Sequence, residues 1–151
     1  MAVPAHQLFA HPGLQRTFTE SERLKTLVVD DSPIFTELAC SVLEQHPAIE
    51  LIGTAQDGVE AIKTGLLLHP GLIVMDIHMP RLDGLAATTL LMGSLPIARI
   101  ILMSSENSSY LRAECRQRGA VAFVPKLGFT EEIRAVLEIL QIDPMMQEGH
   151  S

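Results

Sequence analysis

The sequence predicts an α/β fold of the (βα)5 type, a doubly wound sheet of five parallel strands with helices on both faces. Two observations lead to this fold class. Short apolar runs rich in Val, Ile and Leu recur without polar alternation, as strands buried on both faces of a sheet do. Segments with a helical spacing of apolar residues lie between these runs, so strand and helix alternate five times along the chain.

The first two strand and helix units are expected in the first half of the chain. The first strand is predicted at residues 26–29, and Ser32-Pro33 begins its helix, because proline is tolerated at an early helical position. The second strand is predicted at residues 49–54. The dipeptide Asp57-Gly58 then provides the turn and the cap of the second helix.

The third unit begins with a strand at residues 72–75 that ends at Asp76. A loop containing Met79-Pro80 follows this strand. Asp83, directly before Gly84, is expected to act as the N-cap of the third helix, a position that short acidic side chains favour.

The last two units complete the pattern. The fourth strand is predicted at residues 98–103, and its helix at 107–118 is ended by Gly119. A short fifth strand at 121–124 leads to a last helix at 130–140, whose apolar residues recur at helical spacing.

The chain has the length of one domain, since 151 residues with 47% hydrophobic side chains can bury a single core. Residues 1–23 contain prolines and polar residues without a sustained period, and they are expected to form a flexible or partly docked N-terminal extension. The domain is expected to occupy residues 24–142. A short tail, residues 143–151, follows it.

Composition also argues against several functions. The formal net charge of −7 disfavours a surface for nucleic acid or anionic membranes, because phosphate groups are bound by clustered Lys and Arg, and proteins are therefore the expected partners. Cys40 and Cys115 lack the spacing of a zinc site or of a disulfide framework. Apolar runs too short to span a bilayer, and an N-terminus unlike a signal peptide, predict a cytoplasmic protein.

Four charged residues stand at the ends of apolar strands: Asp30, Asp31, Asp76 and Lys126. The carboxyl ends of parallel strands line one crevice, where open α/β sheets bind ligands. Two like charges ~4 Å apart repel by about 4 kcal/mol at an effective dielectric constant of ~20. Three carboxylates in one crevice therefore predict a site for a divalent cation.

The order of four motifs, VVDDS, LIVMDIHMPRLDG, ILMSS and VAFVPK, on this (βα)5 pattern resembles the receiver domain of bacterial response regulators. The resemblance covers roughly residues 24–142 and implies the flavodoxin-like receiver fold. It also implies a stand-alone, chemotaxis-regulator-like signalling switch that is phosphorylated by a histidine kinase or a histidine phosphotransfer protein. Phosphorylation would change binding of a downstream protein target, and the chain would catalyse only its own aspartyl phosphorylation and dephosphorylation. Homodimerisation on phosphorylation stays open.

The resemblance assigns a role to each motif. Asp76 would accept the phosphoryl group, Lys126 would pair with the phosphoryl oxygens, and Ser104 would donate its hydroxyl to the same group. Mg²⁺, or Mn²⁺, would be held by Asp31 and Asp76, by the backbone carbonyl of His78, and by Asp30 either directly or through water.

Further roles follow from the same resemblance. Ser104 and Phe123 are expected to form the switch, although a buried strand aromatic is an equally good interpretation of Phe123. His78 and Glu106 are expected to tune the rate of dephosphorylation if they contact each other across the entrance; the alternative is two exposed side chains. The dipeptide Lys126-Leu127 stands where many receivers have Lys-Pro in cis, and a trans bond is expected, since a non-proline cis bond costs about 2.5 to 4 kcal/mol.

Other functions share parts of this pattern. The segments GTAQDG, MPRLDGL and GAVAFVPK also resemble receivers attached to chemotaxis methylesterases and to DNA-binding transcription factors, so a fragment of a larger regulator is the main alternative. A flavodoxin-like cofactor binder is disfavoured because Asp30-Asp31-Ser32 would repel a phosphate. An aspartyl phosphohydrolase is disfavoured because Asp76-Ile77-His78 lacks the second aspartate of that class.

Overall fold

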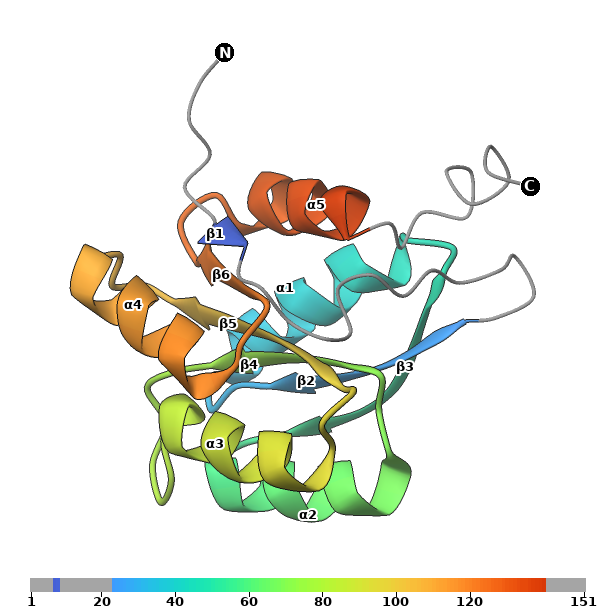
Figure 1. The fold of residues 1–151 in the computed structure, drawn as a ribbon. Coiled ribbons are helices and arrows are strands. Elements are labelled where there is room, and N and C mark those ends of the chain that lie inside the picture. The colour runs from blue at the N-terminus through green and yellow to red at the C-terminus, as the bar shows by residue number, and fades with distance from the viewer. Residues whose placement is uncertain (1–6, 9–22, 141–151) are drawn as a thin grey trace.

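The computed structural model describes residues 7–8 and 23–140, which form a single six-stranded sheet flanked by helices (Figure 1). The strands lie in the order β1-β6-β5-β4-β2-β3. Their bounds are Gln7–Leu8 for β1, Leu24–Val29 for β2, Ile49–Ala55 for β3, Leu72–Asp76 for β4, Arg99–Ser104 for β5 and Ala122–Pro125 for β6.

The predicted doubly wound arrangement is confirmed, because the five strands β2 to β6 pair in parallel. The sheet has one strand more than predicted. β1 pairs antiparallel with β6, with Gln7 opposite Phe123 and Leu8 opposite Ala122. Two residues are too few to produce a periodic pattern, so this pairing had no signal in the sequence. The rest of the extension predicted at 1–23, apart from Arg23, and the tail predicted at 143–151 lie outside the described residues.

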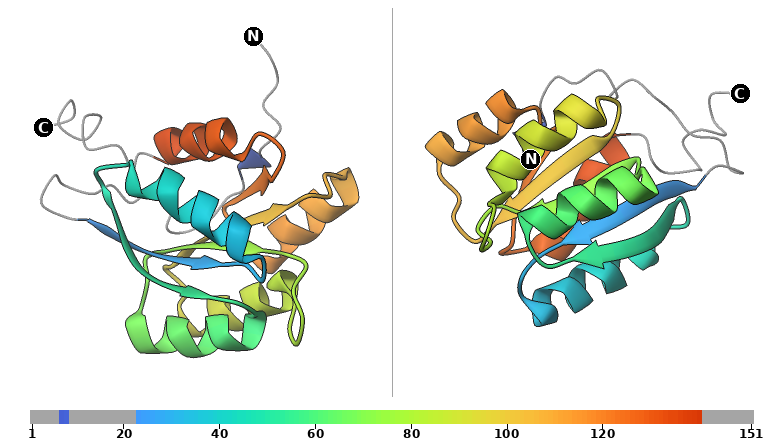
Figure 2. Two further views of the ribbon diagram at one scale, coloured as in Figure 1. Left: turned by 180° about the vertical axis from the view of Figure 1, so that it is seen from behind. Right: turned by 90° about the horizontal axis from the view of Figure 1, so that it is seen from below.

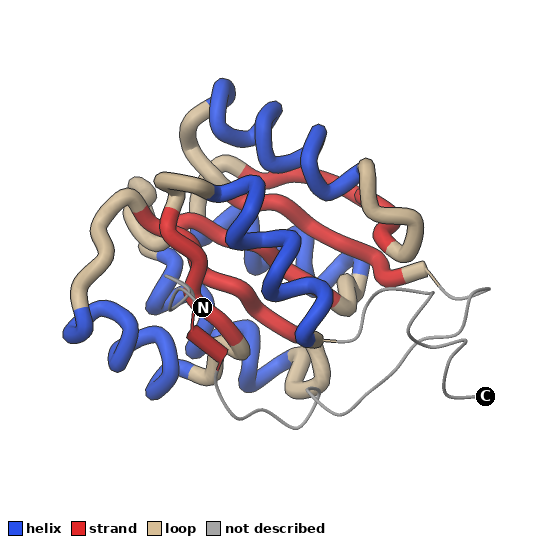
Figure 3. Tube along the Cα trace, turned by 90° about the horizontal axis from the view of Figure 1, so that it is seen from above, coloured by secondary structure: helices blue, strands red, loops and turns tan. Residues whose placement is uncertain are grey.

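Five helices cover the two faces of the sheet (Figures 2 and 3). One apolar cluster joins one face to α1 and α5, and a second joins the other face to α2, α3 and α4. Along the described residues, none of these helices is both long and apolar enough to cross a membrane. Their bounds are Pro33–Glu44 for α1, Gly58–Leu68 for α2, Gly84–Ser94 for α3, Ser109–Arg118 for α4 and Phe129–Ile139 for α5.

The predicted helix caps are present. Ser32, Asp57 and Asp83 each accept a hydrogen bond from a backbone N–H three residues later and so begin α1, α2 and α3. Gly119 ends α4 with φ of 105°, in the left-handed region that glycine adopts without strain. The caps fix where each helix leaves its strand, and therefore where the connecting loops lie.

The parallel pairing of the strands determines where the charged residues of the predicted site lie. Since β2, β4, β5 and β6 run in the same direction, the residues that end them meet at one edge of the sheet. Val29 pairs with Met75, and Ser104 pairs with Pro125. The residues at or directly after these pairs are Asp30, Asp76, Ser104 and Lys126, so these four lie at one edge of the sheet.

Candidate functional site

Three carboxylates gather at the ends of β2 and β4. One ligand oxygen from each of Asp30, Asp31 and Asp76 lies within 4.8 Å of the other two. Asp30 and Asp76 are buried, with 1% and 4% of their surface exposed, whereas Asp31 is exposed. The structure thus brings together the acidic residues that were predicted to share one crevice.

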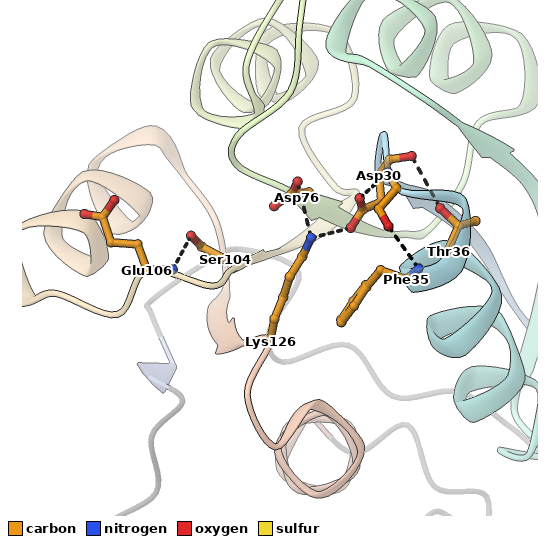
Figure 4. Close-up of polar contacts among 8 residues, drawn as sticks. Asp30, Phe35, Thr36, Asp76, Ser104, Glu106 and Lys126 are labelled. Atoms are coloured by element: carbon orange, nitrogen blue, oxygen red, sulfur yellow. Dashed lines mark hydrogen bonds and ion pairs between the residues drawn. The ribbon is translucent and has the colours of Figure 1, made fainter.

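Lys126 is the cation that faces this cluster (Figure 4). Its Nζ lies 2.7 Å from Asp30 Oδ2 and 3.4 Å from Asp76 Oδ2. The backbone N–H of Lys126 donates to the carbonyl oxygen of Ser104 at 2.8 Å, which ties the end of β6 to the end of β5. One lysine therefore offsets part of a charge that three carboxylates create.

An aromatic ring lies under the lysine. Nζ of Lys126 lies 4.4 Å from the centroid of the Phe35 ring, within the range of a cation–π contact. Phe35 in turn packs edge-on against Phe129, with ring centroids 5.2 Å apart and an interplanar angle of 75°. Phe35 was missed in the sequence, because its position in α1 gave only a helical core spacing; the contact depends on the approach of α1 to α5.

Burial and the neighbouring charges change the pKa of Asp76. Burial and then the neighbouring charge of Asp30 raise the pKa of its carboxyl to about 6, against the opposing effect of Lys126. An ordinary aspartate has a pKa of 3.8. The Asp76 carboxylate is therefore short of positive charge, and any further cation in the crevice would stabilise its ionised form.

Asp30 presents carboxylate oxygens of the kind that bind a hard cation. Its Oδ1 accepts the backbone N–H of Ser32 at 2.8 Å, and its backbone carbonyl oxygen accepts the hydroxyl of Thr36 at 3.3 Å. Its buried Oδ2 lies 2.7 Å from Nζ of Lys126, its ion-pair partner. Three carboxylates faced by this lysine make an all-oxygen cluster, which suits a hard cation such as Mg²⁺.

Ser104 and Phe123, the two residues predicted to form the switch, are both fully buried. Ser104, at the end of β5, is fully buried, and its Oγ accepts the backbone N–H of Glu106 at 3.0 Å. Phe123 in β6 is also fully buried, in the apolar cluster that reaches α3 and α4, and it pairs with Leu102 of β5. The structure has one arrangement of the two residues, so their coupling stays a prediction.

His78 and Glu106 meet at the edge of the site. His78 lies in the loop between β4 and α3, two residues after Asp76, and its Nε2 lies 3.5 Å from Oε1 of Glu106 in the loop between β5 and α4. Both side chains are more than half exposed, at 57% and 56%. The predicted contact is present, and it joins two loops that flank the acidic cluster.

Two further features concern the loops that follow β6 and β4. The peptide bond between Lys126 and Leu127 is trans, as predicted, since the described residues contain no cis bond. Arg81, in the loop after β4, donates two hydrogen bonds to Asp57 at the start of α2. Asp57 was predicted only as a cap, and its partner was missed because the two residues are 24 positions apart with no local pattern between them.

The sequence matches the family described as the response regulator receiver domain over residues 26–138. Among its relatives is protein-glutamate methylesterase/protein-glutamine glutaminase 5 of Geobacter metallireducens, which is 41% identical over 118 residues, 77% of this chain and 32% of the relative. The corresponding protein of Thermotoga maritima is 36% identical over 105 residues, 68% of this chain and 30% of the relative. The chain spans about a third of the length of these curated relatives.

Solved structures agree with the sequence comparison. The response regulator domain of Thermotoga maritima CheB superposes with a TM-score of 0.72 at 32% identity, over 80% of this chain and 95% of that one. The CheX-CheY-BeF3-Mg+2 complex of Borrelia burgdorferi contains a chain with a TM-score of 0.72 at 26% identity, over 78% and 90%. By its fold, its motifs and its sequence, the chain belongs to the response regulator receiver domain family of two-component signalling.

Proposed function

We propose that this chain is a phosphorylation-controlled signalling switch that accepts a phosphoryl group on Asp76. The observation that supports this function best is the meeting of three carboxylates and Lys126 at the ends of parallel strands. The donor would be a histidine kinase or a histidine phosphotransfer protein, and the product would change binding of a downstream protein target. The chain would act as an enzyme only on itself.

The proposed site includes a divalent cation. Asp30, Asp31 and Asp76 would hold Mg²⁺ or Mn²⁺ through oxygen, with the backbone carbonyl of His78 as a further ligand. The buried Oδ2 of Asp30 and the raised pKa of Asp76 both support a cation in this place. When bound, the ion supplies positive charge that offsets the carboxylates and the phosphoryl oxygens.

Phosphoryl transfer needs positioning and charge compensation more than acid or base chemistry. A carboxylate oxygen of Asp76 would attack the phosphorus atom in line with the donor, forming a P–O bond while the P–N bond to the donor imidazole breaks and its electron pair returns to the ring nitrogen. Lys126 would pair with the phosphoryl oxygens, because its Nζ is already 3.4 Å from Asp76. Ser104 would donate a hydrogen bond from its hydroxyl to the same group, since Oγ acts only as an acceptor toward the backbone N–H of Glu106.

Readout of the phosphorylated state would begin at Ser104 and Phe123. Movement of the Ser104 hydroxyl toward the phosphoryl group would change the space around the buried Phe123, and the affected surface would be the one formed by α4, β6 and α5. These elements are contiguous, since α4 and α5 both pack on β6.

A second candidate function is the receiver part of a larger regulator. It is favoured by the methylesterase relatives, of which this chain covers about a third. In that case Asp76 would be phosphorylated in the same way, and the output would be control of an attached methylesterase or DNA-binding domain. Reading the full open reading frame distinguishes this candidate from a stand-alone switch.

The function is tested by phosphorylating the protein with a small phosphodonor and Mg²⁺. We expect the intact mass to rise by one phosphoryl group in the wild type and to stay unchanged in Asp76→Asn, since an amide cannot form the acyl phosphate. Removing Mg²⁺ with a chelator should abolish the mass increase. An adduct that also forms in Asp76→Asn, or none in the wild type, would contradict the proposal.

The pH dependence of stability tests the charge imbalance. Since the folded-state pKa of Asp76 is about 6 rather than 3.8, the folded protein binds more protons than the unfolded chain between these values, and the contribution of Asp76 to stability is lost as pH rises through this window. Without metal, Asp76→Asn should therefore be more stable than the wild type at pH 7.5, with a difference that shrinks toward pH 4. Urea unfolding at both pH values measures this difference, and one that does not vary with pH would contradict it.

The pair formed by His78 and Glu106 would shield the phosphoryl group from in-line attack by water. We therefore expect His78→Ala with Glu106→Ala to lose its phosphoryl group several times faster than the wild type in a dephosphorylation time course. Tyr110→Ala, an exposed substitution on α4, is the matched control and should match the wild type. An unchanged rate in the double variant refutes this role.

The coupling through Phe123 is tested by spectroscopy. With a phosphoryl mimic bound, amide resonances of α4, β6 and α5 should shift in the wild type, and most of these shifts should be lost in Phe123→Ala. Shifts equal to those of the wild type throughout this surface would show that Phe123 is only a core residue.

A further inference from the structure

The loop between β4 and α3, residues 77–83, is held at two places. At its base, the N–H of Gly84, the first residue of α3, donates to the carbonyl oxygen of Ile77 at 2.7 Å. At its far side, the N–H of Gly58 at the start of α2 donates to the carbonyl oxygen of Leu82 at 3.0 Å. This loop contains His78, whose backbone carbonyl is the proposed ligand that does not come from a side chain.

A side-chain pair strengthens the far attachment. Nε of Arg81 donates to Oδ2 of Asp57 at 2.9 Å, and Nη2 donates to the same oxygen. Oδ1 of Asp57 accepts the N–H of Glu60 at 2.8 Å and so caps α2. The Asp57 side chain is only 6% exposed. These hydrogen bonds, first that from Glu60 and then that from Arg81, lower the pKa of Asp57, so it faces Arg81 as a charged carboxylate.

The backbone at Arg81 is in an unfavourable conformation. Its φ is 68°, in the left-handed region where a side chain meets the following carbonyl group and where glycine or asparagine is usual. The Arg81 side chain is 66% exposed, and the ion pair with Asp57 is the contact that accompanies this backbone conformation. The guanidinium of Arg81 reaches Asp57 from this backbone geometry.

The surrounding packing leaves the loop little freedom. A Cβ atom at position 58 would overlap the carbonyl oxygen of Leu82, and one at position 84 would overlap the carbonyl oxygen of Asp76. Both contacts are with backbone, which cannot turn aside as a flexible side chain can. α2, the loop and the end of β4 thus approach one another as closely as main chains allow.

We infer that Arg81 and Asp57 form a positioning pair that holds the loop after β4, and with it the carbonyl of His78, in the arrangement that receives the divalent cation. The inference rests on the proposed function. Neither side chain belongs to the acidic cluster, and they act through the backbone of residues 77–83. Loss of the pair would weaken Mg²⁺ binding and slow phosphorylation at limiting Mg²⁺, while saturating Mg²⁺ would restore it.

The experiment compares variants that remove the pair with different side effects. Arg81→Met removes the ion pair and keeps a side chain with the same backbone strain. Asp57→Asn removes the charge but keeps the cap of α2, because asparagine is an equally good N-cap. Arg81→Lys keeps the positive charge but replaces the planar set of guanidinium N–H donors with a single ammonium group. Arg118→Met, which removes a partly exposed ion pair with Glu114 on α4 and a hydrogen bond to Thr89 on α3, is the matched control.

Mg²⁺ titrations followed by amide chemical shifts give the decisive measurement. Arg81→Met and Asp57→Asn should each raise the dissociation constant for Mg²⁺ roughly tenfold, as loss of a partner behind a metal ligand does. The double variant should be no worse than either alone, Arg81→Lys should lie between, and Arg118→Met should match the wild type. In metal-free protein, the amide of Gly84 should exchange faster in Arg81→Met than in Arg118→Met.

The measurements distinguish failure of the proposed function from failure of the positioning role of Arg81 and Asp57. If the wild type neither binds Mg²⁺ nor forms an adduct at Asp76, the proposed function fails and this inference fails with it. If the wild type does both, and the variants bind Mg²⁺ as tightly as the wild type while losing only resistance to urea, the pair is a structural ion pair alone. That second result overturns the inference and leaves the proposed function intact.

Discussion

Three carboxylates held at one edge of a sheet, faced by a single lysine, form the constraint on which the rest of this structure depends. Like charges at this separation cost several kcal/mol unless they are offset. Lys126 offsets part of this charge, while burial and then the charge of Asp30 still raise the pKa of Asp76 to about 6. The fold supplies the energy to keep the groups together, because four apolar strands bury nearly all of their residues just before the charges begin.

The apolar side of the site matters as much as its charges. Nζ of Lys126 lies over the ring of Phe35, and Phe35 packs against Phe129, so an aromatic pair from α1 and α5 lies beside the charged cluster. This aromatic pair restricts the positions that Nζ can take. From this one position Nζ lies within 4 Å of both Asp30 and Asp76.

Much of the fold could be predicted because its signals are local. Apolar runs marked the five parallel strands, and Ser32, Asp57, Asp83 and Gly119 marked helix ends through contacts within a few residues. Asp30, Asp31 and Asp76 could be grouped because parallel strands end at one edge. The pairing of β1 and the partner of Arg81 could not be predicted, since each joins residues far apart through geometry that no short pattern records. The proposed roles of Ser104 and Phe123 depend on how their arrangement differs between the unphosphorylated and phosphorylated states, which a local sequence pattern does not encode.

The two outer edges of the sheet differ in a way that bears on solubility. An exposed strand edge offers unpaired amides to any neighbouring molecule and so invites intermolecular sheet growth. At one edge, β1 lies antiparallel along β6 and covers the backbone of Ala122 and Phe123. At the other edge, the register with β2 shifts where Thr26 pairs with Leu51 and Leu27 pairs with Gly53, and such an extra residue bends and twists a strand. One edge is thus partly covered by β1 and the other is distorted by the register shift. Both features oppose edge-to-edge pairing of sheets from separate molecules.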